Sequence, residues 1–492
     1  MKRLFLSFIA TLFAVMAVNA ESFSGNIVIT RNGQSYNQPV TVTVTKDNKG
    51  LNTFVLNMAM FGSITMYDVP STTTGDLTVY SAEKDVDTFL GTMRTTLFAR
   101  TINGMMAADV AIPAQNTTMW FNTVDDHFQM PNSDMEAWTS DNGEPDRWHG
   151  FKTAGGSFAS YSAGMVKLEK SNDIHSGSTG SHSAVMTAGS IFSIVANGTM
   201  TNGQLMAGSM SATSTLNHAE MDKSKGTDDF YMPLYAKPDK FNVWLKYTQG
   251  TANANNKASV SVKTFDGTYY QEPVDKTYTN LSGSIVGGSI AACDWTHFTF
   301  DFDYDSYAAN NAATEAIFVT FSTNGNPGQG SGGDALYVDD MELVYLGNMT
   351  DLRYQGATIA GWNPAVTEYS MEFNSEPNLD DFTATIEGAS AVLTKSMEQN
   401  ADGSYRIAIC VVSGDLQTAT AYIINVTVPN VKRGDVNGDG NVTIADVTAL
   451  IDYLLTGNAS AINLANADVN NDEGISIADV TALIDMLLTG AV

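Results

Sequence analysis

The sequence is poor in cysteine and in basic residues, and both shortages limit what the protein can be. Only two cysteines, Cys293 and Cys410, occur in 492 residues. They fall in separate strand-like runs, so we expect two buried thiols rather than a disulfide bridge, and stability must come from β-sheet cores. The 25 basic residues stand against 53 acidic ones, which gives a net charge of −28. This charge argues against nucleic acid and anionic membranes as partners and is compatible with cations or neutral ligands.

Long hydrophobic runs are missing after residue 20. The chain begins with the basic Met1-Lys-Arg3, followed by an apolar segment over residues 4–16 that is too short to span a bilayer. Val18-Asn-Ala20 then offers small residues for cleavage, so we predict a signal peptide over 1–20 that is cut near Ala20. No cysteine follows to take a lipid. We therefore expect no transmembrane segment in the mature chain and a periplasmic, extracellular or cell-surface location.

Helix periodicity is also scarce before residue 430, where the pattern is that of β-strands, and the length predicts several domains. Residues 21–127 contain about eight short apolar or alternating runs, such as 40–45, which predict an antiparallel barrel or sandwich. The segment resembles the calycin-like, lipocalin-type barrels that open many exported proteins of gut Bacteroidetes. Such barrels either hold a small apolar ligand or fill their interior with side chains.

Residues 128–346 form a second segment of β pattern, which predicts a jelly roll of two antiparallel sheets packed face to face. Three motifs mark it: an opening over 130–138 with 144–151, a middle Phe-Asn-Val-Trp-Leu-Lys-Tyr over 241–247, and a closing Tyr-Val-Asp-Asp-Met-Glu-Leu over 337–343. Together they resemble the carbohydrate metabolism domain family. Members of that family are similar to carbohydrate-binding jelly rolls.

Aromatic side chains are the first candidates for sugar binding in this segment. The apolar face of a sugar ring packs on an indole while its hydroxyl groups pair with carboxylates and amides. The candidate platforms are Trp138, Trp148, Trp244 and Trp295, and of these we select Trp138 and Trp148 in the opening motifs. Trp244 lies inside an alternating strand, so we expect it in the core.

Catalytic residues are harder to select in the same segment. A glycosidase needs two carboxylates about 5 to 9 Å apart, and the segment has more carboxylates than the sequence alone can pair. The candidates are Glu136, Glu144, Asp146, Asp339 and Asp340. The histidines have no metal-ligand spacing such as His-x-x-x-His. For Asp339 and Asp340 we weigh a structural calcium site against a solvated turn and favour the turn.

Residues 347–430 contain six or seven further strand-like runs, which is the size of an immunoglobulin-like sandwich. The opening of this segment resembles the cadherin-like β-sandwich repeats of exported bacterial proteins, and we expect a spacer domain. Val431-Lys-Arg433 then connects it to the last segment with little slack.

The last segment, 431–492, contains nearly the same sequence twice. The copies begin at Asp435 and Asp468. Each places oxygen-bearing side chains at positions 1, 3, 5 and 12 of a twelve-residue loop and a backbone carbonyl at position 7, which is the pattern of a Ca²⁺ site. Apolar residues at i, i+3, i+4 and i+7 after each loop predict a helix. The predicted ligands are Asp435, Asn437, Asp439, Asn441 and Asp446 in the first loop, and Asp468, Asn470, Asp472, Gly474 and Asp479 in the second.

Two features distinguish this segment from a pair of ordinary EF-hands. No helix pattern precedes either loop, and position 12 is Asp rather than Glu. The duplicated loop-helix unit resembles the type I dockerin family, which implies two calcium ions and a cohesin-like β-sandwich partner or surface scaffold. Position 6 is Gly440 in the first loop but Glu473 in the second, which predicts weaker binding or altered geometry there. The positions that match cohesin-contacting residues of such modules are Ile444, Ala445, Ile451 and Asp452, and Ile477, Ala478, Ile484 and Asp485.

We therefore predict a secreted, multidomain, mostly β protein: an N-terminal antiparallel barrel, a central jelly roll, a small immunoglobulin-like sandwich, and a dockerin-like calcium module to which the helices are confined. The favoured function is carbohydrate binding or processing by a protein that is anchored or assembled through its C-terminal module. One alternative is a glycoside hydrolase or polysaccharide lyase with its active site in the jelly roll. Another is a non-catalytic structural or adhesion protein.

Overall fold

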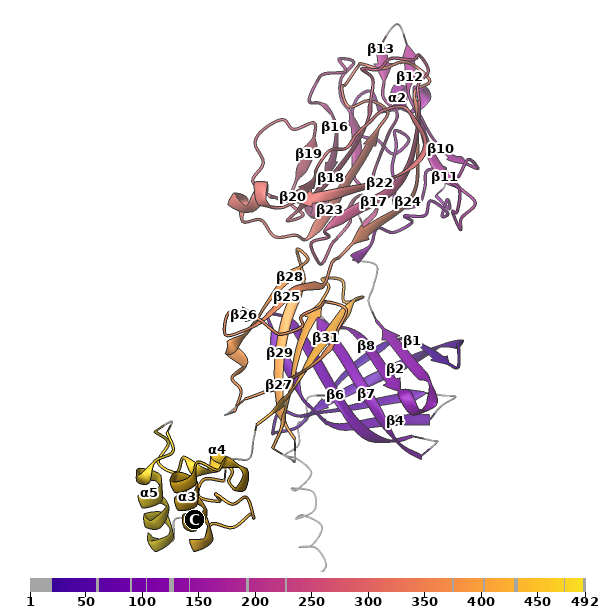
Figure 1. The fold of residues 1–492 in the computed structure, drawn as a ribbon. Coiled ribbons are helices and arrows are strands. Elements are labelled where there is room, and N and C mark those ends of the chain that lie inside the picture. The colour runs from indigo at the N-terminus through magenta and orange to yellow at the C-terminus, as the bar shows by residue number, and fades with distance from the viewer. Residues whose placement is uncertain are drawn as a thin grey trace, which may run out of the picture. The chain divides into compact units, whose positions relative to one another are not determined.

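The computed structural model describes the chain from residue 20 to 489 with short gaps. The described ranges are 20–58, 62–88, 91–102, 104–123, 128–140, 142–191, 194–225, 228–373, 376–400, 403–428, 432–472 and 474–489. The predicted signal peptide up to residue 19 and Glu473 lie outside these ranges. The chain divides into two compact units, the first comprising residues up to 367 with 382–396 and 408–422, and the second the remainder. The predicted mostly β architecture with a helical C-terminal region is confirmed (Figure 1).

One antiparallel sheet forms the first β segment. Its strands, in spatial order, are β4 (Gly62–Val69), β3 (Asn52–Met58), β2 (Gln34–Lys46), β1 (Ala20–Arg31), β9 (Thr117–Asn122), β8 (Met105–Ile112), β7 (Gly91–Ile102), β6 (Leu77–Thr88) and β5 (Ser71–Thr74). The sheet curls into a barrel (Figure 1). Lys84 on β6 donates to the carbonyl of Asp68 on β4 at 2.7 Å, which links strands near opposite edges of the sheet.

Side chains fill the interior of this barrel. Phe54 on β3 meets Tyr80 on β6 edge to face, with ring centroids 4.9 Å apart. The cavity that remains among the inward residues is about 30 Å³, which leaves room for a few water molecules at most and is far smaller than an ordinary ligand site. The resemblance to lipocalin-type barrels left open whether the interior holds a ligand or is filled by side chains. In this structure side chains fill it.

The central segment is a sandwich whose strands join into one continuous hydrogen-bonded sheet. In spatial order these are β10 (Lys167–Ser171), β11 (Ser183–Thr187), β24 (Ala335–Val344), β17 (Lys240–Thr248), β22 (Cys293–Asp303), β20 (Leu281–Ile285), β18 (Ala258–Phe265), β23 (Ala316–Ser322) and β14 (Thr199–Thr201), with β21 (Ser289–Ile290) beside β18. Two smaller sheets accompany it: β12 (Gly189–Ile191) with β13 (Ile194–Ala196), and β15 (Gln204–Ala207), β16 (Asn217–Met221) and β19 (Tyr270–Glu272).

The sandwich core follows from the period-two pattern of its strands. Along β17, Phe241, Val243 and Leu245 are fully buried, and the residues between them are only partly buried. Phe241 packs against Phe321 of β23 across the core, with ring centroids 6.4 Å apart. Trp244 is one of the partly buried residues, so the expectation that it lies in the core is wrong.

A seven-residue helix, α2 (Ala159–Met165), also belongs to the sandwich. The prediction that helices are confined to the C-terminal module is therefore wrong. The segment Ala-Ser-Tyr-Ser-Ala-Gly-Met lacks the apolar stripe by which helices are recognised in a sequence, because none of its residues is buried.

The third β segment contains two sheets. The first has the order β26 (Ala357–Thr358), β25 (Asn348–Tyr354) and β28 (Phe382–Glu387), and the second β27 (Glu368–Glu372), β31 (Ala419–Thr427), β30 (Tyr405–Val412) and β29 (Val392–Gln399). Strands β27 and β31 are parallel, whereas β25 is antiparallel to both of its partners. Neither cysteine forms a disulfide within the described part of the chain; Cys410 is buried and Cys293 half-buried.

The C-terminal module is helical. It comprises α3 (Ile444–Thr456), the short α4 (Leu464–Ala467) and α5 (Ile477–Thr489). Its core contains apolar residues from the loops and from one side of each long helix: Val436, Val447, Leu450, Ala467, Val469, Val480 and Leu483. Among the described residues, no helix combines the length and hydrophobicity needed to span a bilayer.

Trp148 offers a test of the sandwich core, because its indole is fully buried beside Phe321. We predict that Trp148→Ala destabilises the sandwich by about 3–5 kcal/mol, the usual loss when a large buried aromatic ring is removed. Calorimetric unfolding of the full chain measures this effect. Trp138→Ala, which removes a partly buried indole, is the matched control and should cost less; equal losses for the two variants would contradict the burial seen here.

Candidate functional site

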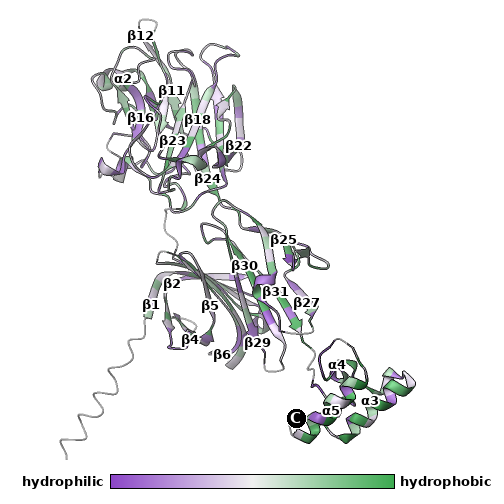
Figure 2. Ribbon diagram, turned by 90° about the vertical axis from the view of Figure 1, so that its left-hand side faces the viewer, coloured by the Kyte–Doolittle hydropathy of each residue, from purple (hydrophilic) through white to green (hydrophobic). Residues whose placement is uncertain are grey.

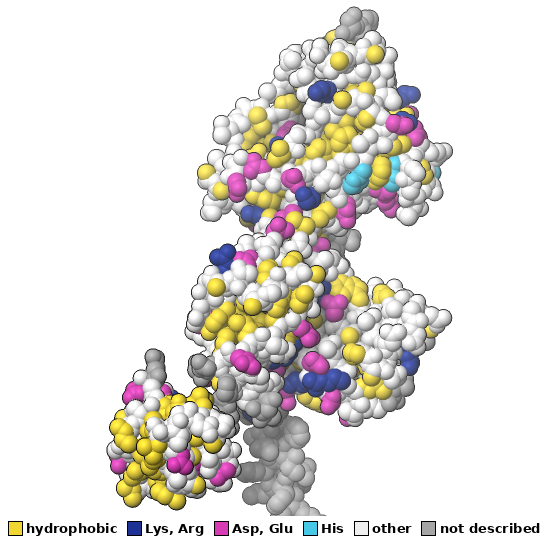
Figure 3. All heavy atoms as spheres, in the orientation of Figure 1, with side chains coloured by type: hydrophobic (Ala, Val, Ile, Leu, Met, Phe, Trp, Pro, Cys, Tyr) yellow, Lys and Arg dark blue, Asp and Glu magenta, His cyan; other side chains and the backbone are white. Residues whose placement is uncertain are grey.

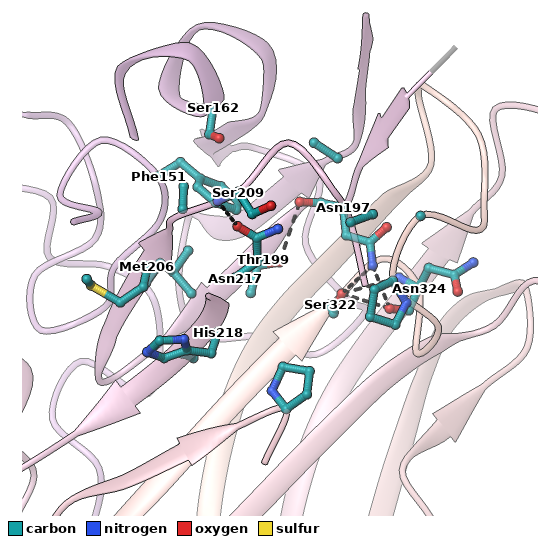
Figure 4. Close-up of a pocket in the computed structure, with 18 of the residues that line it drawn as sticks. Phe151, Ser162, Asn197, Thr199, Met206, Ser209, Asn217, His218, Ser322 and Asn324 are labelled. Carbon is teal, nitrogen blue, oxygen red and sulfur yellow. Dashed lines mark hydrogen bonds between the residues drawn. The ribbon is translucent and has the colours of Figure 1, made fainter. Parts of the chain in front are cut away.

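The central sandwich contains a cleft of about 830 Å³ (Figure 4). Part of its lining consists of hydroxyl groups on the non-core face of three strands. Ser259 and Ser261 of β18 point toward the cleft because the residues that alternate with them belong to the core. Thr199 of β14 and Thr320 and Ser322 of β23 lie beside them in the lining. The strand alternation thus supplies a row of small polar groups.

Aromatic and other apolar side chains form another part of the lining. Phe151, Phe158 and Tyr161 contribute rings, and Met206 and Pro273 add further apolar surface. Tyr161 stands on α2 and is 71% exposed. The rings of Phe158 and Tyr161 lie 6.4 Å apart. The cleft therefore combines apolar surfaces with hydroxyl and amide groups.

Two asparagines of the lining have polar atoms without partners. Asn197 donates to the backbone carbonyl of Asn324 at 2.8 Å, which holds the two side by side. The Oδ1 of Asn197 and the Nδ2 of Asn324 are both buried and have no hydrogen-bond partner among the described residues. An unpaired buried polar group costs free energy, so the side chains of these two asparagines are incompletely satisfied at the wall of the cleft.

A histidine with fixed hydrogen bonds completes the polar lining. His218 of β16 contacts the carbonyl of Thr215 through Nδ1 at 2.8 Å and the carboxylate of Glu220 through Nε2 at 2.9 Å. The hydrogen bond from His218, helped by Lys225 and Tyr269, lowers the pKa of Glu220 to about 2. Glu220 is thus an ionised group that orients His218.

The charge of the cleft is low. Glu272 is the one carboxylate among the lining residues that the structure describes, and this described lining includes no lysine or arginine. Tyr270 donates to Glu272 at 3.0 Å, and the ammonium group of Lys263 lies 3.6 Å from it. A neutral ligand fits such a surface better than a strongly charged one.

The two tryptophans predicted as sugar platforms do not line this cleft. Trp148 is 0% exposed, and its indole nitrogen donates to the carbonyl of Pro131 at 3.2 Å, so no face of the ring is open to a ligand. Trp138 is half-buried against the core, and its indole nitrogen donates to the carbonyl of Met135. Sequence reasoning missed the aromatic residues that do line the cleft.

The carboxylates of the opening motif fix loops. Glu144 is buried and accepts hydrogen bonds from the backbone of Gly150 and Lys152. Asp146 accepts from the backbone of Thr139 and Ser140, and these contacts, with the Thr139 hydroxyl first, lower its pKa. These side chains hold the loop that carries Trp148 in place.

The first C-terminal loop folds around the carboxylates predicted as ligands. Asp446, at position 12, accepts hydrogen bonds from the backbone of Asn437 and Thr443. Asp435, at position 1, accepts one from Gly440 at 2.9 Å, and its other carboxylate oxygen is buried without a partner. An unpaired buried carboxylate oxygen is the kind of ligand that a calcium ion requires.

The carboxylates of the second loop lie close to one another. One oxygen from each of Asp468, Asp472 and Asp479 lies within 4.8 Å of the others. Asp479 repeats the contacts of Asp446, since it accepts from Val469, Asn470 and Ser476. The remaining predicted ligands surround the Asp at position 5 of each loop. The side-chain amide groups of Asn437 and Asn470 donate to Asp439 and Asp472, respectively. The backbone amide groups of Asn441 and Gly474 donate to the same two aspartates.

The aspartates at position 12 also begin the helices. Thr443 is the N-cap of α3, and the side chains of Thr443 and Asp446 form a capping box with the backbone. The loop geometry that binds a cation is therefore continuous with the first turn of the helix. In the second loop, Asn471 takes the left-handed conformation (φ 60°) that Gly438 takes in the first (φ 72°).

The two long helices expose matching apolar residues. Ile444 and Ile477 are each 71% exposed, and Ile451 and Ile484 are each 38% exposed. The other predicted contact residues, Ala445, Asp452, Ala478 and Asp485, are exposed as well. Figure 2 shows hydrophobic residues along α3 and α5, and Figure 3 shows hydrophobic side chains gathered on the surface of this module. A repeated apolar surface of this kind indicates a protein-binding site.

A family comparison agrees with this geometry: the family model for the dockerin type I domain matches residues 433–488. The C-terminal module is a dockerin type I domain. Dockerin type I domains bind calcium, and their partners are cohesins. Proteins that carry a dockerin are typically extracellular or on the cell surface.

Solved structures give weaker similarities beyond the dockerin. A candidate glycoside hydrolase from Bacteroides thetaiotaomicron VPI-5482 is 13% identical, with a TM-score of 0.33, over 51% of this chain and 86% of its own. The tandem CBM22 domains of Paenibacillus barcinonensis Xyn10C are 8% identical, with a TM-score of 0.21, over 66% of this chain and 74% of their own. The M60 catalytic domain with two CBM51 domains of Clostridium perfringens ZmpB is 11% identical, with a TM-score of 0.17, over 86% of this chain and 41% of its own.

These scores are too low to establish a shared overall fold. No curated protein sequence matches the chain significantly. Any function beyond the dockerin must therefore be argued from the side chains of the cleft.

Proposed function

We propose that this chain is a secreted carbohydrate-binding protein that holds a neutral glycan in the cleft of its central sandwich and is assembled on a cohesin through its dockerin. The observation that carries the proposal is the composition of the cleft. Aromatic rings, small hydroxyl groups and asparagine side chains surround a space of about 830 Å³. Sugars present apolar C–H faces and hydroxyl groups together, which is the chemistry that such a lining complements.

Binding without hydrolysis is the favoured activity. The usual glycosidase mechanism needs two carboxylates on either side of the scissile bond, about 5 to 9 Å apart. Glu272 is the one carboxylate in the described lining, and it is already paired with Tyr270. Hydrolase or lyase activity in the jelly roll is the alternative, and release of reducing ends or unsaturated sugars from a polysaccharide panel would establish it.

Tyr161 is the most direct test of glycan binding. We predict that Tyr161→Ala weakens binding of the full chain to its glycan by about tenfold, because an exposed ring that stacks on a sugar is removed from a short helix that it does not stabilise. A glycan array followed by calorimetric titration measures this change. Tyr67→Ala is the matched control, since Tyr67 is 64% exposed on β4 of the barrel and lies outside the cleft. Equal binding by both variants would contradict the assignment of the cleft.

We assign two calcium ions to the dockerin, one in each loop. Asp435 and Asp468 occupy the same position in the two copies, so they form a matched pair for this test. Asp435→Asn and Asp468→Asn should each remove one equivalent of calcium in a titration of the full chain. Chelation should expose residues 433–489 to proteolysis, because the carboxylates of each loop repel one another without the ion. If Asp468→Asn leaves the stoichiometry unchanged, the second loop does not bind calcium.

The matching exposure of the two helices supports a cohesin-binding surface that works in two orientations related by a twofold rotation. We predict that Ile444→Arg alone lowers cohesin affinity only about twofold, because the orientation that uses Ile477 remains. The double variant with Ile477→Arg should lose at least about a hundredfold, since a charge then faces an apolar partner in both orientations. Surface plasmon resonance on an immobilised cohesin measures both effects. A full loss of binding in either single variant would exclude the second orientation.

A further inference from the structure

A histidine and two aspartates meet in the central sandwich outside the cleft. The metal-ligating atoms of His175, Asp339 and Asp340 all lie within 4.8 Å of one another. His175 is separated from the aspartates by most of the sandwich sequence, so the fold rather than a local motif assembles this cluster. None of the three residues lines the cleft or belongs to the dockerin.

A β-bulge brings the two aspartates together. Neighbouring residues of a regular strand point to opposite faces of the sheet, so Asp339 and Asp340 would normally diverge. The register between β17 and β24 shifts between the pairs Asn242–Glu342 and Trp244–Asp339, which places an extra residue on β24. Asp340 lies in this bulge with a left-handed φ of 41°. Bulges of this kind re-aim side chains, and here both carboxylates approach the same histidine.

His175 is held in one orientation by three contacts. Its ring stacks on the indole of Trp244 with centroids 4.1 Å apart and an interplanar angle of 1°. Its Nδ1 lies 3.1 Å from the carbonyl of Ser176, and because a carbonyl only accepts, Nδ1 carries the proton. Its Nε2 lies 2.6 Å from a carboxylate oxygen of Asp340, a hydrogen bond that fixes the opposite edge of the ring. This is the arrangement by which metal-binding histidines are fixed.

Asp339 provides an independent indication of a ligand. The residue is 0% exposed, its Oδ1 accepts the amide hydrogen of Asp340, and its Oδ2 is buried without a hydrogen-bond partner. Within the described part of the chain, neither aspartate forms an ion pair with a lysine or arginine. A divalent cation held among the three groups would give the buried Oδ2 of Asp339 a partner and would balance the negative charge that the carboxylates carry when ionised.

We infer that His175, Asp339 and Asp340 form a binding site for a divalent transition-metal ion of the zinc class, distinct from the calcium loops of the dockerin. An imidazole nitrogen favours zinc over calcium, which prefers oxygen ligands alone. Three protein ligands leave a fourth position for water or a ligand oxygen. His175 Nε2 and Asp340 Oδ2 lie 2.6 Å apart. They need to separate by about 0.7 Å, because two tetrahedral ligands that each lie about 2.0 Å from an ion are about 3.3 Å from each other.

Zinc itself is the probe for this site. The full chain, first saturated with calcium so that the dockerin loops are filled, is titrated with Zn²⁺ and followed by calorimetry and by thermal unfolding. The expected result is one high-affinity zinc equivalent and a rise in the melting temperature of the sandwich. His175→Gln and Asp339→Asn should each abolish both changes.

His297→Gln is the matched control. His297 is exposed, and its ring centroid lies 5.2 Å from that of Trp244, the indole on which His175 stacks. Because His297 is not one of the three proposed ligands, this variant should still bind one equivalent of zinc. Far-ultraviolet circular dichroism without zinc shows whether each variant is folded, and His175→Gln decides the question if Asp339→Asn does not fold. Zinc binding that survives both ligand variants, or an absence of zinc binding by the wild-type chain, would overturn the inference. Loss of a calcium rather than a zinc equivalent in these variants would overturn it as well.

Discussion

The two-residue repeat of the β-strand determines where the functional side chains of the sandwich lie. On β18 and β23 the repeat sends one set of residues into the core and leaves serine and threonine hydroxyl groups along the cleft. On β17 the same repeat buries Phe241, Val243 and Leu245 and places Trp244 on the other side of the strand, where His175 stacks on it. A register slip of one residue would exchange these faces and remove both sites at once.

The dockerin depends on a different device, in which one side chain serves both a loop and a helix. Asp446 and Asp479 accept backbone hydrogen bonds from the start of their loops and from the residue at the start of the helix. The aspartate at position 12 is thereby also the third residue of the helix, where a carboxylate favours the helix dipole. The geometry of each loop is thus coupled to the first turn of the helix that follows it.

Features that depend on short stretches of sequence were predictable. The spacing of Asp435, Asn437, Asp439 and Asp446 and its repetition identified the dockerin, and alternation identified the β architecture. The alternation around Trp244 also contained enough information to place that residue outward, since Phe241, Val243, Leu245 and Tyr247 define the buried set. The general preference of tryptophan for the interior predicts the wrong side of the strand here, whereas the local alternation predicts the right one.

Features that depend on distant parts of the chain were not predictable. The cleft joins Phe151 and Tyr161 to strands more than a hundred residues later, and no single motif indicates that meeting. Trp148 and Phe151 stand in the same motif, yet Trp148 belongs to the core and Phe151 lines the cleft. The meeting of His175 with Asp339 and Asp340 required both the tertiary fold and a bulge that breaks the strand repeat.

The equal exposure of Ile444 and Ile477 has a consequence for how the dockerin tolerates change. Two equivalent bound arrangements double the number of states of a complex, which adds a statistical free energy of RT ln 2, about 0.4 kcal/mol, without any new contact. Under the proposed binding in two orientations, the larger effect would be redundancy, because a substitution in one copy leaves the other copy able to bind. Either copy could then change while the protein stayed attached to its partner.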